Sequence, residues 1–145
     1  MFERLRAAID AALDAASSPA DKRDIVSGMR DAVIEAHAAL QGMRDGLART
    51  ERELAAEKKY LEDAERRGRM AAGIGDQETV DVAERFAAKH KERVSVLERK
   101  VGAQRAEISL MERELSEMKG QMKKVAGSNS VENAWRGIEM AGGTR

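Results

Sequence analysis

The segment 40–64 reads LQGMRDGLARTERELAAEKKYLEDA and carries an aliphatic residue every seven positions. The repeat extends toward the N-terminus, and its members, called position a, are Val26, Val33, Leu40, Leu47, Leu54 and Leu61. The position between them, called d, holds Met29, Ala36, Met43, Thr50, Glu57 and Ala64. A sustained 3.5-residue spacing predicts a helix whose apolar seam is buried against another helix.

A second stretch repeats the pattern closer to the C-terminus. Its a positions are Val80, Ala87, Val94, Val101, Ile108, Leu115 and Met122. Its d positions are Ala83, His90, Leu97, Gln104, Met111, Met118 and Val125. Ala, Glu, Lys, Leu and Arg dominate the chain and proline occurs once, which is typical of long helices. The sequence therefore predicts an all-α protein with a coiled coil over residues 20–125.

A glycine-rich break separates the two stretches between Gly68 and Asp76. Gly73 suits the left-handed residue that ends a helix, and Asp76 suits the cap of the next helix, with Glu78 in its first turn. Two arms of nearly equal length around one short break favour an antiparallel hairpin with its tip near 68–76, rather than one kinked helix.

Two registers of this hairpin remain open. Caps at the tip favour facing residues whose numbers sum to about 151, such as Leu54 with Leu97. That register sets Glu51 near Glu98 and Lys58 near Lys91, which are like charges. A shift of one heptad, to a sum near 144, gives four opposite-charge pairs instead, each worth about 0.2–1 kcal/mol if exposed. These pairs are Arg30–Glu112, Arg44–Glu98, Glu51–Lys91 and Lys58–Glu84.

The two ends of the chain carry separate apolar faces. Residues 1–16 form an amphipathic helix before Ser17-Ser18-Pro19, and its apolar face holds Phe2, Leu5, Ile9 and Leu13. Such a helix either lies in a membrane interface or packs on the hairpin or on another subunit. Residues 126–145 hold a linker and a short helix over 131–141. The apolar face of this helix, Val131, Trp135 and Ile138, either docks a partner or another subunit or packs within its own chain.

Composition argues against several classes of function. The chain has no cysteine, two histidines and no zinc or phosphate-loop motif, so we expect no catalytic residues, no metal and no cofactor. His90 is expected to touch the opposite arm. The formal net charge is zero, which predicts no nucleic-acid binding. No apolar stretch is long enough to span a bilayer and no secretion signal is evident, so a cytoplasmic protein is expected.

Several segments, taken together, resemble the phage shock protein A family of bacteria. This family includes the vesicle-inducing plastid proteins and belongs to the ESCRT-III superfamily. The resemblance rests on the amphipathic start before Pro19 and on the segments at 25–29, 54–61, 97–101, 115–119 and 134–139. These read IVSGM, LAAEKKYL, LERKV, LSEMK and AWRGIE.

The resemblance implies a membrane-stress effector that assembles with itself and remodels or protects the inner membrane, to which it binds peripherally. Phe2, Leu5, Ile9 and Leu13 would then face anionic lipid, and a regulatory protein is a further candidate partner. The chain is shorter than typical members, and only one short helix follows the hairpin. Two alternatives stay open: a soluble coiled-coil adaptor that binds a protein partner without membrane contact, and a subunit that only positions a catalytic partner.

Overall fold

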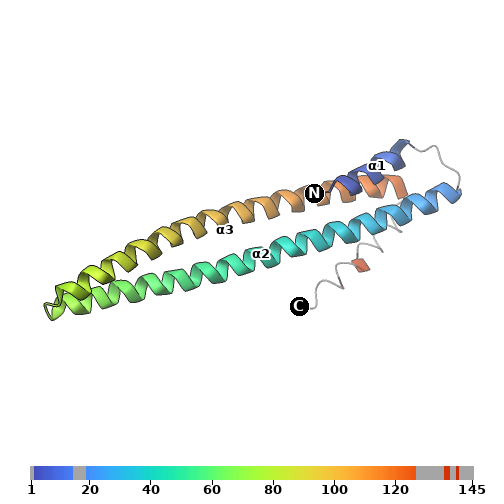
Figure 1. Ribbon diagram of the computed structural model, residues 1–145. Helices are drawn as coiled ribbons and strands as arrows, with labels where there is room; N and C mark the ends of the chain where they lie inside the picture. Colours follow the sequence, from blue (N-terminus) through green and yellow to red (C-terminus); the bar gives the residue numbers. More distant parts are fainter. Residues whose placement is uncertain (1, 15–18, 127–135, 138–139, 141–145) are drawn as a thin grey trace. The chain divides into compact units, whose positions relative to one another are not determined.

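The computed structural model describes residues 2–14, 19–126, 136, 137 and 140, excluding the side chains of 12–14, 19–23, 125 and 126. It contains the helices α1 (Glu3–Asp14), α2 (Pro19–Gly73) and α3 (Gln77–Ala126) (Figure 1). No strand occurs among these residues. The prediction of an all-α hairpin is thereby confirmed. Most of the predicted C-terminal helix lies outside the described residues, and only Arg136, Gly137 and Met140 are seen in helical conformation.

The first long helix begins at the only proline of the chain. Pro19 is the first residue of α2, one residue earlier than the start predicted at residue 20. A proline lacks the backbone N–H group, but the N–H groups of a first helical turn have no partner within the helix. Its fixed φ also suits a helix start, so Pro19 defines this end of α2 without disrupting it.

The hairpin tip closes through two backbone hydrogen bonds that end α2. Asp76 N donates to Ala71 O at 2.9 Å, and Gly75 N donates to Ala72 O at 3.2 Å, which is the pattern of a Schellman motif. Gly75 has the positive φ of 75° that this motif requires. The prediction that Gly73 takes the left-handed conformation was wrong, because α2 continues through Gly73 and the reversal falls two residues later.

The residue that completes this motif also starts α3. Asp76 Oδ1 accepts a hydrogen bond from the backbone N of Thr79 at 3.1 Å, and Thr79 Oγ1 donates to Asp76 Oδ2 at 2.6 Å. Both bonds favour the ionised carboxylate, so they hold the pKa of Asp76 below its ordinary value of 3.8. The predicted N-cap is confirmed, and Glu78 lies in the first turn as expected.

The chain divides into two compact units. Unit 1 comprises Met1–Met43 and Ile108–Arg145, and unit 2 comprises Arg44–Glu107. In unit 1, α1 packs with the first part of α2 and the last part of α3, which gives three helices around one core. The apolar side chains buried in this unit are Phe2, Leu5, Ile9, Met29, Ala32, Val33, Ala36, Leu40, Ile108, Leu115, Met118 and Met122.

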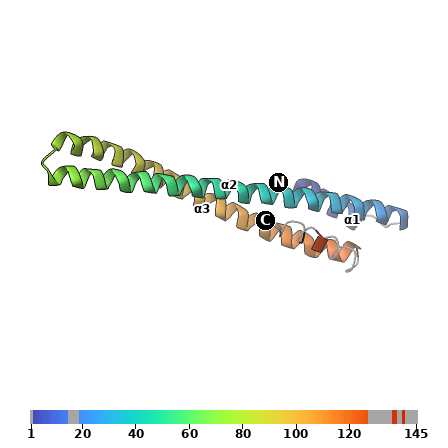
Figure 2. The same ribbon diagram turned by 90° about the horizontal axis from the view of Figure 1, so that it is seen from below.

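Unit 2 contains only α2 and α3, which lie side by side up to the tip (Figure 2). Its buried side chains are mostly small: Thr50, Ala64, Ala71, Ala83 and Val101. The seam leucines Leu54, Leu61 and Leu97 are half-buried. In a pair of helices, each helix covers only the stripe of the other that faces it. The residues that flank the seam in unit 2 therefore stay accessible.

The heptad seam is confirmed wherever its side chains are described. Each a and d position of both arms, Val125 excepted, is buried or half-buried, and none is exposed. A Cβ atom built on Gly68 would lie 3.4 Å from the Cβ of Ala83, which fits facing numbers that sum to about 151.

Ion pairs between the arms explain how this register tolerates its like charges. Lys58 Nζ lies 3.4 Å from Glu98 Oε1, and Arg105 Nη2 donates to Glu51 Oε1 at 2.8 Å. Glu51 thus pairs with the residue one heptad beyond Glu98, the like charge that faces it. Lys58 likewise pairs with the residue one heptad beyond Lys91. This diagonal pairing combines the register near 151 with opposite-charge contacts.

Candidate functional site

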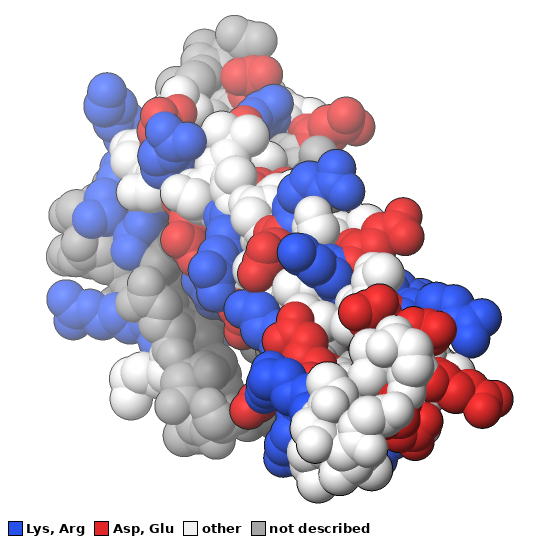
Figure 3. Space-filling view, turned by 90° about the vertical axis from the view of Figure 1, so that its left-hand side faces the viewer, with Lys and Arg blue, Asp and Glu red and all other residues white. Residues whose placement is uncertain are grey.

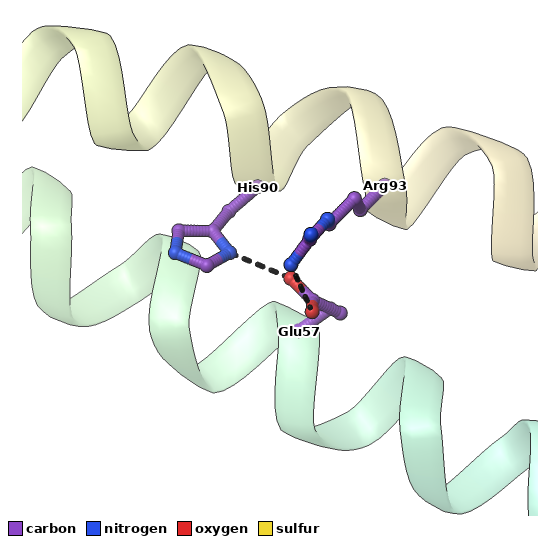
Figure 4. A network of polar contacts seen from close by, with 3 residues as sticks. All are labelled: Glu57, His90 and Arg93. Atoms are coloured by element: carbon purple, nitrogen blue, oxygen red, sulfur yellow. Dashed lines mark hydrogen bonds and ion pairs between the residues drawn. The ribbon is translucent and has the colours of Figure 1, made fainter.

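A polar cluster crosses the apolar seam of unit 2. His90 Nδ1 donates a hydrogen bond of 2.6 Å to Glu57 Oε2, and Arg93 Nη1 donates to Glu57 Oε1 at 3.3 Å (Figure 4). Glu57 projects from α2, whereas His90 and Arg93 project from α3. The prediction that His90 touches the opposite arm is confirmed. Glu57 and His90 both occupy d positions, so a charged contact replaces an apolar layer here.

Both oxygens of the Glu57 carboxylate accept bonds from α3. The hydrogen bond from His90, together with the charges of His90 and Arg93, holds the pKa of Glu57 below its ordinary value of 4.5, although partial burial opposes this. Because the carboxylate is the acceptor, Nδ1 of His90 must carry a proton. The cluster therefore links the two helices through a charged acceptor.

An aromatic groove lies beside this cluster. The rings of Tyr60 and His90 are tilted by 37° with centroids 5.4 Å apart. Phe86 and Val82 stand on the α3 side of the groove, while Tyr60 stands on the α2 side. Tyr60 is 53% exposed, Phe86 55% and Val82 38%. Three large apolar side chains thus face water around one hollow.

The groove is open and has a volume of about 480 Å³. Small residues form its floor, since Ala64 and Ala83 are buried, and their size leaves room between the larger side chains of the walls. Asp63 and Arg67 supply charges at the α2 wall, and Asp63 also accepts a bond of 2.8 Å from Arg66. An apolar hollow with a few charges at its edge is typical of a recognition surface.

The adjoining tip also exposes apolar side chains. Met70 is 67% exposed and Ile74 is 82% exposed. Figure 3, which looks onto the tip, shows uncharged atoms at the nearest part of the surface with charged side chains on both sides. Exposed apolar groups that gather in one region mark an interaction surface more often than single scattered ones do.

The predicted lipid-facing residues of α1 lie against protein in this structure. Phe2, Leu5 and Ile9 are 3%, 1% and 1% exposed. Leu13 lies within α1, but its side chain is outside the described residues. Ion pairs hold the polar side of α1, from Arg4 to Glu35 on α2 and from Arg6 to Glu114 on α3. The apolar side chains Phe2, Leu5 and Ile9 therefore share one face, as the sequence predicted, and this face packs on the hairpin.

The predicted docking residues Val131, Trp135 and Ile138 lie outside the described residues. Within the described part of the chain, no group of acidic residues and histidines is arranged to hold a metal ion. Over the same residues, no helix combines the length and the apolar character needed to cross a membrane.

No protein-family model, curated protein or solved structure matches this chain.

Sequence reasoning did not identify the groove. Three of its wall residues, Tyr60, Arg67 and Phe86, occupy position g, which flanks the seam, and the predicted core covers only a and d. The available signal was an aromatic residue at position g on each arm, where exposed charged residues are usual in coiled coils. The partner of His90 was also missed, because Glu57 was counted only as a seam position.

Proposed function

We propose that this chain is a non-catalytic, self-assembling hairpin protein that binds the surface of a membrane through α1, as its resemblance to the phage shock protein A family implies. The observation that supports the proposal most is that α1 is an amphipathic helix of its own, with Phe2, Leu5 and Ile9 on one face. An apolar helix face of this kind can lie in a protein groove or in a lipid interface.

The contacts of α1 permit it to leave the hairpin and bind a lipid interface instead. The ion pair between Arg4 and Glu35 is largely solvent-accessible, with side chains 71% and 61% exposed, whereas Glu114, the partner of Arg6, is 28% exposed. Exposed pairs of this kind contribute about 0–1 kcal/mol and weaken with salt. The apolar face contributes more, at about 1.5–3 kcal/mol for each large side chain, but insertion into a lipid interface would keep much of that burial.

Release of α1 would also favour assembly. In unit 1, Ala32 and Val33 of α2 and Leu115 of α3 are buried in a core that includes α1. A hairpin without α1 would expose part of this core, and contact with another copy would cover it again. Membrane binding and self-association are therefore expected to occur together.

The test is flotation of the purified protein with anionic vesicles, since aggregates sediment but do not float. The chain has no native cysteine, so Arg4→Cys and Glu35→Cys together allow α1 to be tethered to α2 by a short bis-maleimide linker. The untreated double variant is the matched control. We expect the control and the wild type to float, and the tethered protein and a chain starting at Ala20 to stay at the bottom.

The proposal fails if wild-type protein does not float, or if tethering leaves flotation unchanged. The burial of Phe2, Leu5 and Ile9 favours a second candidate function, in which α1 stays on the hairpin and the protein acts as an adaptor for a protein partner. Protein that never floats, and that remains monomeric with and without vesicles, would support this second function.

A further inference from the structure

We propose that the groove of unit 2 between Tyr60 and Phe86 is a docking site for an amphipathic helix of a partner protein. The partner helix would present an apolar face to the groove and a basic side chain to Asp63. This inference does not depend on membrane binding by α1.

The first argument comes from the heptad positions of the groove. Tyr60 lies four heptads after Ala32 on α2, and Phe86 lies four heptads before Glu114 on α3. In an antiparallel hairpin, a shift of four heptads forward on α2 is matched by a shift of four heptads back on α3. Tyr60 therefore faces Phe86 in the same register in which Ala32 faces Glu114. Asp63 likewise lies four heptads after Glu35. The groove of unit 2 therefore repeats, by position, a site that also exists in unit 1.

In unit 1 the repeated site is filled by a helix. Ala32 is 2% exposed, and Glu35 and Glu114 bind the arginines of α1 at 2.8 and 2.9 Å. The occupant is thus a short amphipathic helix that covers the flank of the seam and pairs its basic side chains with both arms. Unit 1 thus shows which kind of element a site at these heptad positions accepts.

The chemistry of the groove in unit 2 fits an occupant of the same kind. Asp63, which also accepts a bond of 2.8 Å from Arg66, keeps the acidic side chain of the Glu35 position and favours a basic residue on the partner. Ala64, like its equivalent Ala36, is a small buried residue beside the groove. Phe86 replaces Glu114, so the α3 wall offers an apolar anchor where unit 1 offers a charge. Phe86 and Tyr60, each more than half exposed, are the side chains that an apolar helix face would cover.

The occupant is a partner's helix rather than α1 of a second copy. Leu5 and Ile9 of α1, and Phe2 directly before it, are already buried in unit 1 of their own chain. An α1 that moved to another copy would leave its own site empty, and the intramolecular site has the advantage of a high effective concentration. A helix from a different protein carries no such cost.

The test uses a fluorescent peptide of residues 1–16 as the probe, because this segment has the required apolar face and arginines. Fluorescence anisotropy measures its binding to the full-length chain, whose unit 1 already contains α1. We expect saturable binding that Phe86→Ala weakens at least about tenfold, since a central aromatic anchor contributes most of the affinity. Leu110→Ala is the matched control, because Leu110 is an exposed apolar residue of α3 that does not line the groove, and we expect no change.

A charge exchange provides the second arm of the test. Asp63→Arg should weaken binding of the peptide several-fold, and a peptide with Arg4→Glu should restore it. Binding that survives Phe86→Ala, or equal binding by a scrambled peptide, would overturn the proposal. Two other results would also overturn it by assigning the groove elsewhere: loss of self-association in Phe86→Ala would assign it to a second copy, and loss of vesicle flotation in that variant would assign it to a membrane.

Discussion

Glu57 and His90 connect the two long helices within unit 2, with 2.6 Å between Glu57 Oε2 and His90 Nδ1. Both residues occupy seam positions that leucine or another apolar residue would usually fill. The imidazole also contacts the ring of Tyr60, which forms one wall of the groove, in a tilted arrangement. The polar contact therefore holds a residue of the candidate docking site in place.

The contact predicts a specific response to acid. Because the pKa of Glu57 is lowered in the folded protein, its contribution to stability is complete above its ordinary value of 4.5 and is lost as the pH falls through the lowered value. Glu57→Gln should lower the melting temperature at neutral pH, and the difference from wild type should shrink in acid. Thermal unfolding followed by circular dichroism from pH 7 to pH 3 measures this, with the exposed Glu62→Gln as the control. A difference that stays constant with pH would contradict the role given to Glu57.

The tip glycines predict opposite effects of the same substitution. Gly75→Ala should destabilise the protein by about 1–2 kcal/mol, because its φ of 75° disfavours any side chain. Gly73→Ala should be neutral or stabilising by up to about 1 kcal/mol, since Gly73 is helical and nothing lies near its added Cβ. Urea denaturation of both variants compares them directly, and equal effects would contradict the Schellman motif at Gly75.

The cap of α3 predicts a difference between two substitutions at one position. Asp76→Ala removes the acceptor for the backbone N of Thr79 and should lower the melting temperature. Asp76→Ser keeps a short acceptor and should retain most of the stability. Because the pKa of Asp76 is lowered, its contribution is present above 3.8 and disappears as the pH falls further. If Ala and Ser behave alike at neutral pH, the side chain does not cap α3.

The core of unit 1 predicts that α1 contributes to the stability of the free protein. Leu5→Ala should lower the free energy of unfolding by about 2–3 kcal/mol, because Leu5 is 1% exposed. Ile34→Ala, at a site that is 47% exposed, should change it by less than about 0.5 kcal/mol. Hydrogen exchange of the α1 amides provides a local measurement. Unchanged protection in Leu5→Ala would show that α1 is not packed as described.

The sequence predicted the fold well because the seam positions follow a heptad spacing that is visible in a single amino-acid sequence. The a and d stripes located most of the described core of α2 and α3, but they missed Ala32, which lies at position g under the third helix of unit 1, and Ala71 next to the tip. The left-handed residue at the tip was placed wrongly, since Gly73 and Gly75 are both glycines and only the hydrogen bonds of Ala71 and Ala72 distinguish them.

The site was harder to predict than the seam. The apolar face of α1 is compatible with lipid and with protein, so periodicity alone could not place Phe2, Leu5 and Ile9. The groove depends on residues flanking the seam, and their exposure follows from whether a third helix lies on that side. Whether a third helix covers that side is decided by tertiary packing, so it could not be predicted from Tyr60 and Phe86 alone.

The arrangement of the groove depends on the antiparallel register, and a designed disulfide tests that register most directly. Gly68→Cys and Ala83→Cys should form an intramolecular disulfide under mild oxidation, because the two Cβ positions lie 3.4 Å apart and disulfides have Cβ distances of about 3.5–4.5 Å. Leu61→Cys with Ala83→Cys, displaced by one heptad, should remain reduced. Non-reducing electrophoresis and peptide mass analysis distinguish the outcomes. A disulfide in the displaced pair alone, or only intermolecular links between chains, would contradict the hairpin described here.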